Sequence, residues 1–135
     1  MQKIWYECIA MSRKAHLLLP LFGLLAAGCG ASTTFTPTAP PPHALMQRPA
    51  SAVVVLAYWD GTGPAVEIGI LTATSDAHTQ MSDARGRVLR QLLKLAATTG
   101  CDAILPGPPG EDLYASSSGT PLFRTIQTAS CLVYR

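Results

Sequence analysis

The chain has 135 residues, four cysteines, 13% charged residues and a formal net charge of +2. This length favours a single domain. Three of the ten basic residues and one of the eight acidic residues lie upstream of Cys29, so seven of each remain and the rest of the chain is neutral. Phosphate-backbone binding depends on a clustered excess of Lys and Arg, so nucleic-acid binding is not expected.

The segment 1–28 has the order of a secretory signal peptide. Arg13-Lys14 precedes an apolar run over positions 17–27. A transmembrane helix needs about twenty apolar residues, and this run is too short. The start of the segment includes an acid and bulky aromatics, so a start at Met11 is favoured over one at Met1.

The leader ends in small residues and a cysteine, Ala26-Ala27-Gly28-Cys29. This stretch resembles the lipobox of bacterial lipoproteins, although Ala26 stands where that family usually has Leu, Val or Ile. The resemblance implies lipidation of Cys29, hence a palmitate-type membrane anchor. Gly30 after it, rather than Asp, implies outer-membrane attachment facing the periplasm or the cell surface. The alternative is an ordinary signal peptide cut after an A-x-A-like site.

The segment 29–50 is rich in proline and threonine and has no apolar periodicity. Proline lacks a backbone donor, and so polar a segment cannot build a packed face. We expect a disordered tether after the lipidated cysteine. Fully extended at roughly 3.1 Å per residue, it would hold the domain on the order of 60 Å from the lipid.

The segment 51–135 should form one small domain. The apolar, β-branched stretch 51–59 predicts a buried strand, and 66–73 predicts a second. A helix should start at Ser82-Asp83, which offer an N-cap and a first-turn acid, and stop at Gly100. Its apolar stripe consists of Val88, Leu89, Leu92, Leu93, Ala96 and Ala97.

The opposite helix face is basic, with Arg85, Arg87, Arg90 and Lys94. Such a face could contact acidic lipid headgroups or a partner, but charged residues opposite an apolar stripe are also typical of any surface helix.

After the helix, the stretch 101–105 predicts a short strand, 107–120 an exposed excursion rich in turn residues, and 122–134 a closing strand. The order strand, strand, helix, strand, strand indicates an α+β fold. We expect a two-layer sandwich with one helix packed on a small, mainly antiparallel sheet.

Two cysteines lie inside the domain, Cys101 after the helix and Cys131 on the last strand. In an exported protein such a pair normally forms a disulfide. Closing a loop of about 31 residues should contribute on the order of 3.5 kcal/mol. Metal or redox chemistry would need C-x-x-C or nearby histidines, so we expect no metal site. Cys8 would not be translated if the chain starts at Met11, and otherwise it would be lost with the leader.

Catalytic groups are sparse in the sequence. The candidates are His43, His78, Asp60, Asp76, Asp83 and the run Ser116-Ser117-Ser118. His78 is a lone histidine in a polar loop, and the serines lack a nucleophile-elbow context. We therefore expect no enzyme, no catalytic residues, no cofactor and no small-molecule substrate.

The helix end reads Leu92-x-x-x-Ala96-x-x-x-Gly100-Cys101-Asp102-Ala103-Ile104. It resembles the motif of small β/α domains such as that of the outer-membrane lipoprotein that senses envelope stress for the Rcs phosphorelay. That sensor has two disulfides, whereas this domain can form one. The resemblance implies a lipid-tethered periplasmic or surface domain that acts through protein contacts.

Together these features predict an envelope lipoprotein whose non-catalytic domain binds another envelope protein, as in stress sensing or signalling. The alternative is a structural or assembly accessory of the outer membrane without a signalling role.

Overall fold

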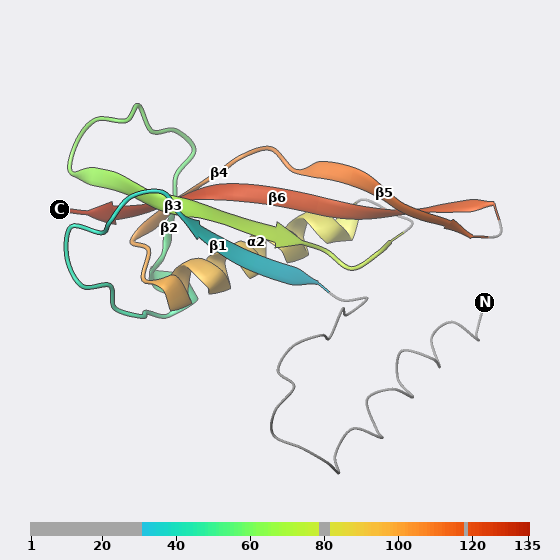
Figure 1. The fold of residues 1–135 in the computed structure, drawn as a ribbon, viewed down its shortest axis with the longest axis horizontal. Helices are drawn as coiled ribbons and strands as arrows, with labels where there is room; N and C mark the ends of the chain where they lie inside the picture. Colours follow the sequence, from blue (N-terminus) through green and yellow to red (C-terminus); the bar gives the residue numbers. More distant parts are fainter. Residues whose placement is uncertain (1–30, 79–81, 118) are drawn as a thin grey trace, which may run out of the picture.

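The computed structural model describes residues 31–78, 82–117 and 119–135. The predicted signal peptide and the predicted lipidation site at Cys29 lie outside the described residues. One helix packs on a six-stranded sheet (Figure 1). The elements in chain order are β1 (Ser32–Pro37), the short 3-10 helix η1 (Ala50–Ala52), β2 (Val54–Val55), β3 (Ala65–Thr74), α2 (Ser82–Thr99), β4 (Ala103–Pro106), β5 (Gly110–Ser117) and β6 (Thr120–Tyr134).

The sheet is built around β6, which pairs with β3 along one side and with β4 and then β5 along the other. The order is β1-β3-β6-β4-β2, with β5 beside β6. Every pairing is antiparallel except that of β2 with β4. The predicted α+β architecture of one helix on a mainly antiparallel sheet is confirmed. The predicted strand order is wrong, because two strands were missed.

The first missed strand lies in the predicted tether. Ser32–Pro37 pairs antiparallel with β3 over its whole length, with Phe35 opposite Leu71. The prediction that the segment 29–50 is disordered is therefore wrong for this strand. Threonine is a good strand former, and β1 lies at the sheet edge, where its terminal Pro37 is tolerated.

The Phe35 side chain of β1 packs directly against Gly69 of β3. A Cβ on Gly69 would overlap a carbon of the Phe35 ring, so the ring occupies the space of a side chain. Gly69 also adjoins a register irregularity between β3 and β6. Any larger residue at position 69 would push β1 away.

The second missed strand is β5, in the segment predicted as an exposed excursion. Gly110–Ser117 pairs with the first part of β6, and Gly119 turns the chain at φ 78°. The turn residues of this segment led to the prediction of an irregular excursion. The Gly-Pro-Pro run lies before the strand, however, and does not interrupt it. The predicted strand over 51–59 is reduced to Val54–Val55 after η1.

The predicted helix is confirmed as Ser82–Thr99, followed by Gly100 at φ 95°. The predicted capping roles of Ser82 and Asp83 concern side chains outside the described ones. No Cβ fits easily at Gly100, where it would approach the Met46 backbone to 3.0 Å. A positive φ and this close approach explain why a glycine ends the helix.

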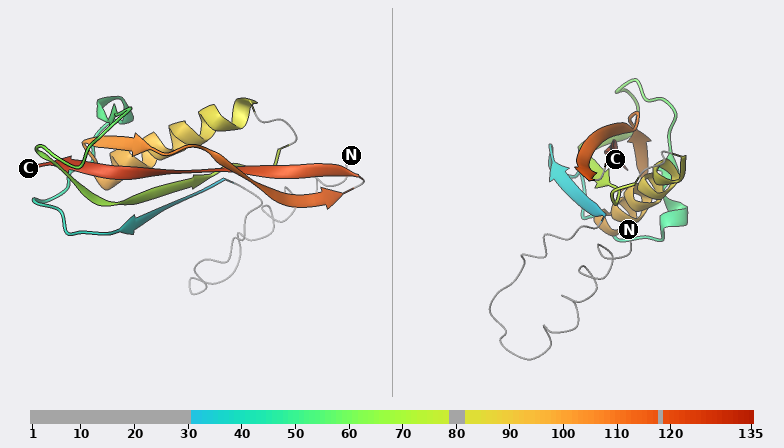
Figure 2. Two further views of the ribbon diagram at one scale, coloured as in Figure 1. Left: turned by 90° about the horizontal axis from the view of Figure 1, so that it is seen from above. Right: turned by 90° about the vertical axis from the view of Figure 1, so that its right-hand side faces the viewer.

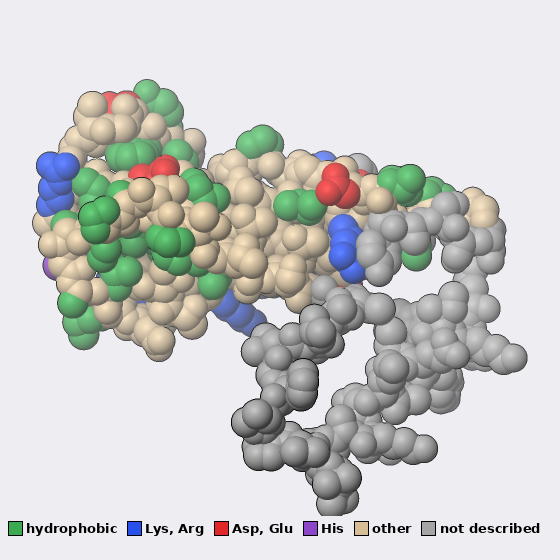
Figure 3. All heavy atoms as spheres, viewed as in Figure 1, with side chains coloured by type: hydrophobic (Ala, Val, Ile, Leu, Met, Phe, Trp, Pro, Cys, Tyr) green, Lys and Arg blue, Asp and Glu red, His purple; other side chains and the backbone are tan. Residues whose placement is uncertain are grey.

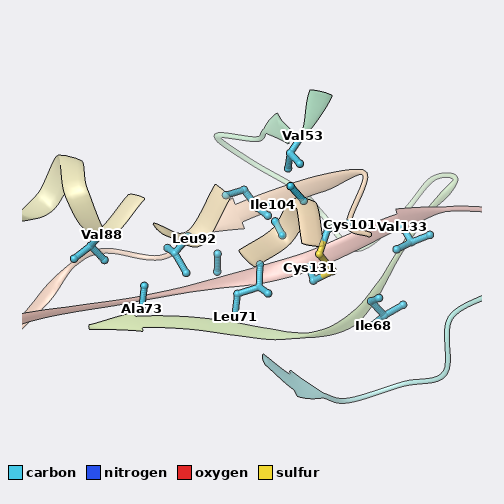
Figure 4. Close-up of a cluster of buried hydrophobic side chains, with 13 residues drawn as sticks. Val53, Ile68, Leu71, Ala73, Val88, Leu92, Cys101, Ile104, Cys131 and Val133 are labelled. Carbon is cyan, nitrogen blue, oxygen red and sulfur yellow. A yellow bond between two sulfur atoms is a disulfide. The ribbon is translucent and has the colours of Figure 1, made fainter. Parts of the chain in front are cut away.

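The core lies between α2 and the sheet (Figure 4). Leu92 from α2, Leu71 from β3 and Ile104 from β4 are fully buried there. Fully burying such a side chain stabilises the fold by about 1.5–3 kcal/mol. A smaller cluster on the other face of the sheet is formed by Ala65, Ala103 and Leu132, with Leu56, Trp59 and Leu105 packed against it.

The arm, residues 110–124, is a two-stranded ribbon that extends past the helix (Figure 2). Within β6 the burial pattern changes along the strand. From Thr125 onward, buried positions recur along the strand, whereas Thr120 and Pro121 are exposed. The strand therefore belongs to the layered body at one end and to the arm at the other.

Candidate functional site

The cysteine pair lies in the centre of the core. The Cys101 and Cys131 sulfur atoms are 2.03 Å apart and the Cα atoms 5.5 Å apart, a disulfide. Both residues are fully buried. The bond joins the end of α2 to the central strand β6 (Figure 4). It is thus placed to hold the two layers together rather than to react with a solute.

His78 lies at the root of the arm. Its backbone forms an isolated bridge with Phe123, and its Nε2 lies 2.9 Å from Thr125 Oγ1. The Thr125 amide donates to the Ser75 hydroxyl oxygen at 2.9 Å, and that hydroxyl donates to the Asp76 carbonyl. Thr125 and Ser75 are buried, so this cluster ties strands together inside the protein.

The remaining catalytic candidates are scattered. Ser116 and Ser117 lie on β5 in the arm, with side chains outside the described ones, and Ser118 is not described. The Asp83 side chain is likewise outside the described ones. The structure brings His78 to Thr125, which is bonded to Ser75, whereas the surroundings of the serine run lie outside the described side chains.

His43 belongs to the strap, residues 38–49, which crosses from β1 to η1 along one end of the sheet. Its Nε2 donates to the Tyr134 carbonyl and its Nδ1 contacts the Ala44 carbonyl, each at 3.0 Å. The hydrogen bonds to these two carbonyls raise the pKa of His43 above 6.5, and the bond to Ala44 has the larger effect. The doubly protonated ring suits this position because both nitrogens face acceptors.

An ion pair holds the strap from the other side. The Arg48 guanidinium pairs with the Asp102 carboxylate, which also accepts from the Tyr134 amide. The Arg48 amide donates to the Ala97 carbonyl near the end of α2. The strap is therefore a bonded part of the body and not a free spacer.

A cleft of about 540 Å³ opens at the same end of the molecule. The strap forms one wall, and the loop over residues 57–64 forms the other. Glu67 and Arg135 place one charge of each sign in the lining. The full lining is Ala39, Pro40, Pro42, Trp59, Gly61, Gly63, Ala65, Val66, Glu67 and Arg135.

A short turn fixes Trp59 in the cleft wall. The Thr62 amide and hydroxyl both donate to Asp60, at 2.9 and 2.6 Å, and the indole N–H donates to the Thr62 carbonyl. The two hydrogen bonds from Thr62 lower the pKa of Asp60, and the bond from the hydroxyl has the larger effect. The turn is thus best ordered when the carboxylate is charged.

Exposed apolar side chains gather near this end. Tyr58 is 77% exposed, Met46 75%, and Val54, Val55 and Tyr134 between 40 and 48%. Figure 3 shows the largest group of hydrophobic side chains over the end that carries the 57–64 loop, with smaller, separate groups farther along the molecule. An in-register row of three threonines, Thr34, Thr72 and Thr128, crosses β1, β3 and β6. Of the exposed large apolar side chains among the described residues, all but Leu113 in the arm therefore belong to this end of the molecule.

Sequence reasoning missed the cleft because its two walls were assigned to a strand end with its turn and to a tether. The only signals were an aromatic pair before a Gly-rich turn and a proline run upstream. No pattern in either segment indicates that the two segments face each other.

Within the described ranges, no group of three or more His, Cys, Asp or Glu residues is arranged to hold a metal ion. The same residues include no helix that is both long and apolar enough to cross a membrane.

Comparisons with known proteins give little. No protein-family model matches the chain, and no curated protein matches it. Among solved structures, the crystal structure of a Francisella virulence factor, FvfA, in its orthorhombic form is similar with a TM-score of 0.48 and 17% identity. The match covers 74% of this chain and 96% of that one. A likeness this distant carries no argument about function.

Proposed function

We propose that this chain is a lipid-anchored envelope protein whose domain binds another protein and catalyses no reaction. Cys29, at the end of the lipobox-like stretch, carries the anchor, and the outer membrane, facing the periplasm or the surface, is its location. The cleft beside the strap receives the partner. A stress-sensing or signalling role is the specific form that the resemblance to the Rcs sensor lipoprotein favours.

The observation that carries the binding role is the cleft with its surroundings. Its lining combines an indole held by a hydrogen-bonded turn, two prolines and a pair of opposite charges. Aromatic residues in a preformed depression are typical anchors of protein interfaces. The 77% exposed Tyr58 adds apolar surface next to Trp59.

The hydroxyl groups near His78 support a binding role over catalysis. Ser75 accepts from the Thr125 amide and donates to a backbone carbonyl, and Thr125 is fully buried. A nucleophile must reach a substrate and pass its proton to a base. Here the hydroxyls serve the joint between β3 and β6.

Radiolabelled palmitate tests the anchor. Wild-type protein should incorporate the label in a bacterial host, and Cys29→Ala should not. Equal incorporation by the two would remove the lipid from the proposal.

A photo-crosslinker tests the partner. Benzoylphenylalanine at position 58 should form one discrete adduct in intact cells, and Trp59→Ala should abolish that adduct because it removes the cleft wall. The same crosslinker at Leu113, 65% exposed in the arm, is the control and should give none. No adduct from position 58 under any stress condition would favour the structural accessory over the sensor.

A further inference from the structure

The basic face of α2 lies next to the place where the described chain begins. A shallow groove between β1 and α2 is lined by Ala31, Thr33, Gln91, Lys94, Leu95 and Thr98. Only Gly30 and Ala31 separate Ser32, the start of β1, from Cys29. The predicted anchor therefore joins the protein directly beside this helix.

This attachment leaves little slack. Three chain steps from Cys29 to Ser32 span at most about 11 Å when fully extended. The tether expected from the sequence would have spanned on the order of 60 Å. Attraction between fixed charges and an anionic membrane fades over the Debye length, about 8 Å at physiological salt. The short attachment keeps the helix close to that range, whereas a long tether would not.

The helix has the charge for such a surface. Arg87, Arg90 and Lys94 are exposed and lie one turn apart on the side away from the core. Arg85 adds a fourth exposed cation, and Asp83 is the one acidic residue of α2. Among the described residues, the ion pair is that of Arg48 with Asp102. None of these four cations of α2 therefore pairs with a described carboxylate.

We propose that α2 lies with its basic face on the anionic phospholipid surface into which the lipid of Cys29 is inserted. This inference rests on the proposed lipid anchor. Each Lys or Arg near an anionic surface strengthens binding by about fivefold, so three of them bias the orientation by about two orders of magnitude. The cleft, which is lined by the first part of the strap beyond β1, stays available to a protein partner.

Two exposed threonines make a matched pair of reporters. Thr98 lies on α2 in the groove beside Ala31, and Thr128 lies on the sheet face that α2 leaves uncovered. In lipidated protein with the Cys101–Cys131 disulfide, Thr98→Cys or Thr128→Cys introduces one free thiol for a bimane label. The labelled proteins are reconstituted in phosphatidylcholine vesicles with about 30% phosphatidylglycerol and nitroxide-headgroup lipid.

We expect headgroup quenching of the Thr98 label to exceed that of the Thr128 label several-fold. The difference should fall markedly in pure phosphatidylcholine vesicles and in the Arg87→Gln, Arg90→Gln, Lys94→Gln variant, which keeps the lipid, because only the position of the anchor beside Ala31 then favours the Thr98 side. Equal quenching in anionic vesicles, or stronger quenching at position 128, would overturn the orientation. An asymmetry that the triple substitution leaves unchanged would overturn its electrostatic basis.

Failure of the anchor itself looks different. If Cys29 carries no lipid, palmitate labelling is absent and the protein does not stay with vesicles, whichever residue bears the fluorophore. The quenching comparison is made only on protein shown to be lipidated, so its outcome reports the orientation alone.

Discussion

The body and the arm share β6 but are held together differently. In the body, β6 has neighbours on both sides and a helix above it, and Cys131, Leu132 and Val133 are fully buried. In the arm, the same strand pairs with β5, and no second layer of described residues covers the ribbon (Figure 2). A two-stranded ribbon alone is marginally stable in water. The arm therefore depends on its root at Thr125 and His78, whereas the body carries the stability of the domain.

The disulfide gives the largest expected difference between the two regions. Cys101→Ala with Cys131→Ala should lower the free energy of unfolding by on the order of 3.5 kcal/mol, because the unfolded chain regains loop freedom. Denaturant unfolding of the variant and of reduced wild type measures it, and the two should agree. A loss below about 0.5 kcal/mol would mean that the body does not need the bond.

A matched pair of leucines comes next. The Leu92 side chain is fully buried, whereas Leu113 in the arm is 65% exposed. Leu92→Ala should cost about 3 kcal/mol, because it leaves a cavity in the core. Leu113→Ala should change the free energy of unfolding by no more than about 0.5 kcal/mol. Thermal or urea unfolding compares them. Similar losses at both sites would show that the arm is covered by apolar contacts in solution.

The joint between body and arm can be weakened by Thr125→Val. The substitution keeps the shape of the side chain but leaves His78 Nε2 without its hydroxyl partner. Such a loss should cost about 1–3 kcal/mol of stability at the joint. Hydrogen exchange should speed up over residues 110–124 and stay unchanged in α2. Uniformly faster exchange would contradict a separate arm and make the two regions one cooperative unit.

The smallest expected effect is a pH dependence in the strap, where His43 lies. In the folded protein, hydrogen bonds to the Ala44 and Tyr134 carbonyls raise the pKa of His43 above its ordinary value of 6.5. The contribution of protonated His43 to the stability of the fold is therefore complete below the pKa of the unfolded state, and it is lost as pH rises through the pKa of the folded state. His43→Gln should remove this pH dependence. Unfolding midpoints of both proteins between about pH 5 and 8 measure it. Parallel curves would exclude the linkage.

Local patterns explain which parts of the fold could be predicted. The helix follows from its apolar spacing and from Gly100, and β3 from its β-branched run. The cysteine pair follows from its positions in an exported chain. Each of these signals lies within one segment.

The rest depends on contacts between distant segments. β1 is stabilised by Gly69, which leaves room for Phe35, and no pattern within residues 32–37 reports that space. β5 is stabilised by pairing with the first part of β6, which extends beyond the body. The cleft needs the strap and the 57–64 loop to face each other, which only the fold determines. Binding surfaces made by such loops are the least visible in a sequence.

The fit of Phe35 against Gly69 also sets a limit on where the protein can be shortened. The sequence places the domain start at residue 51, and a fragment cut there would lack β1. Its strand β3 would then have an unpaired edge, and the space above Gly69 would be empty. Exposed edges recruit other chains, so such a fragment should aggregate. Recombinant versions should therefore begin no later than Ala31, even though the segment 31–50 looks dispensable.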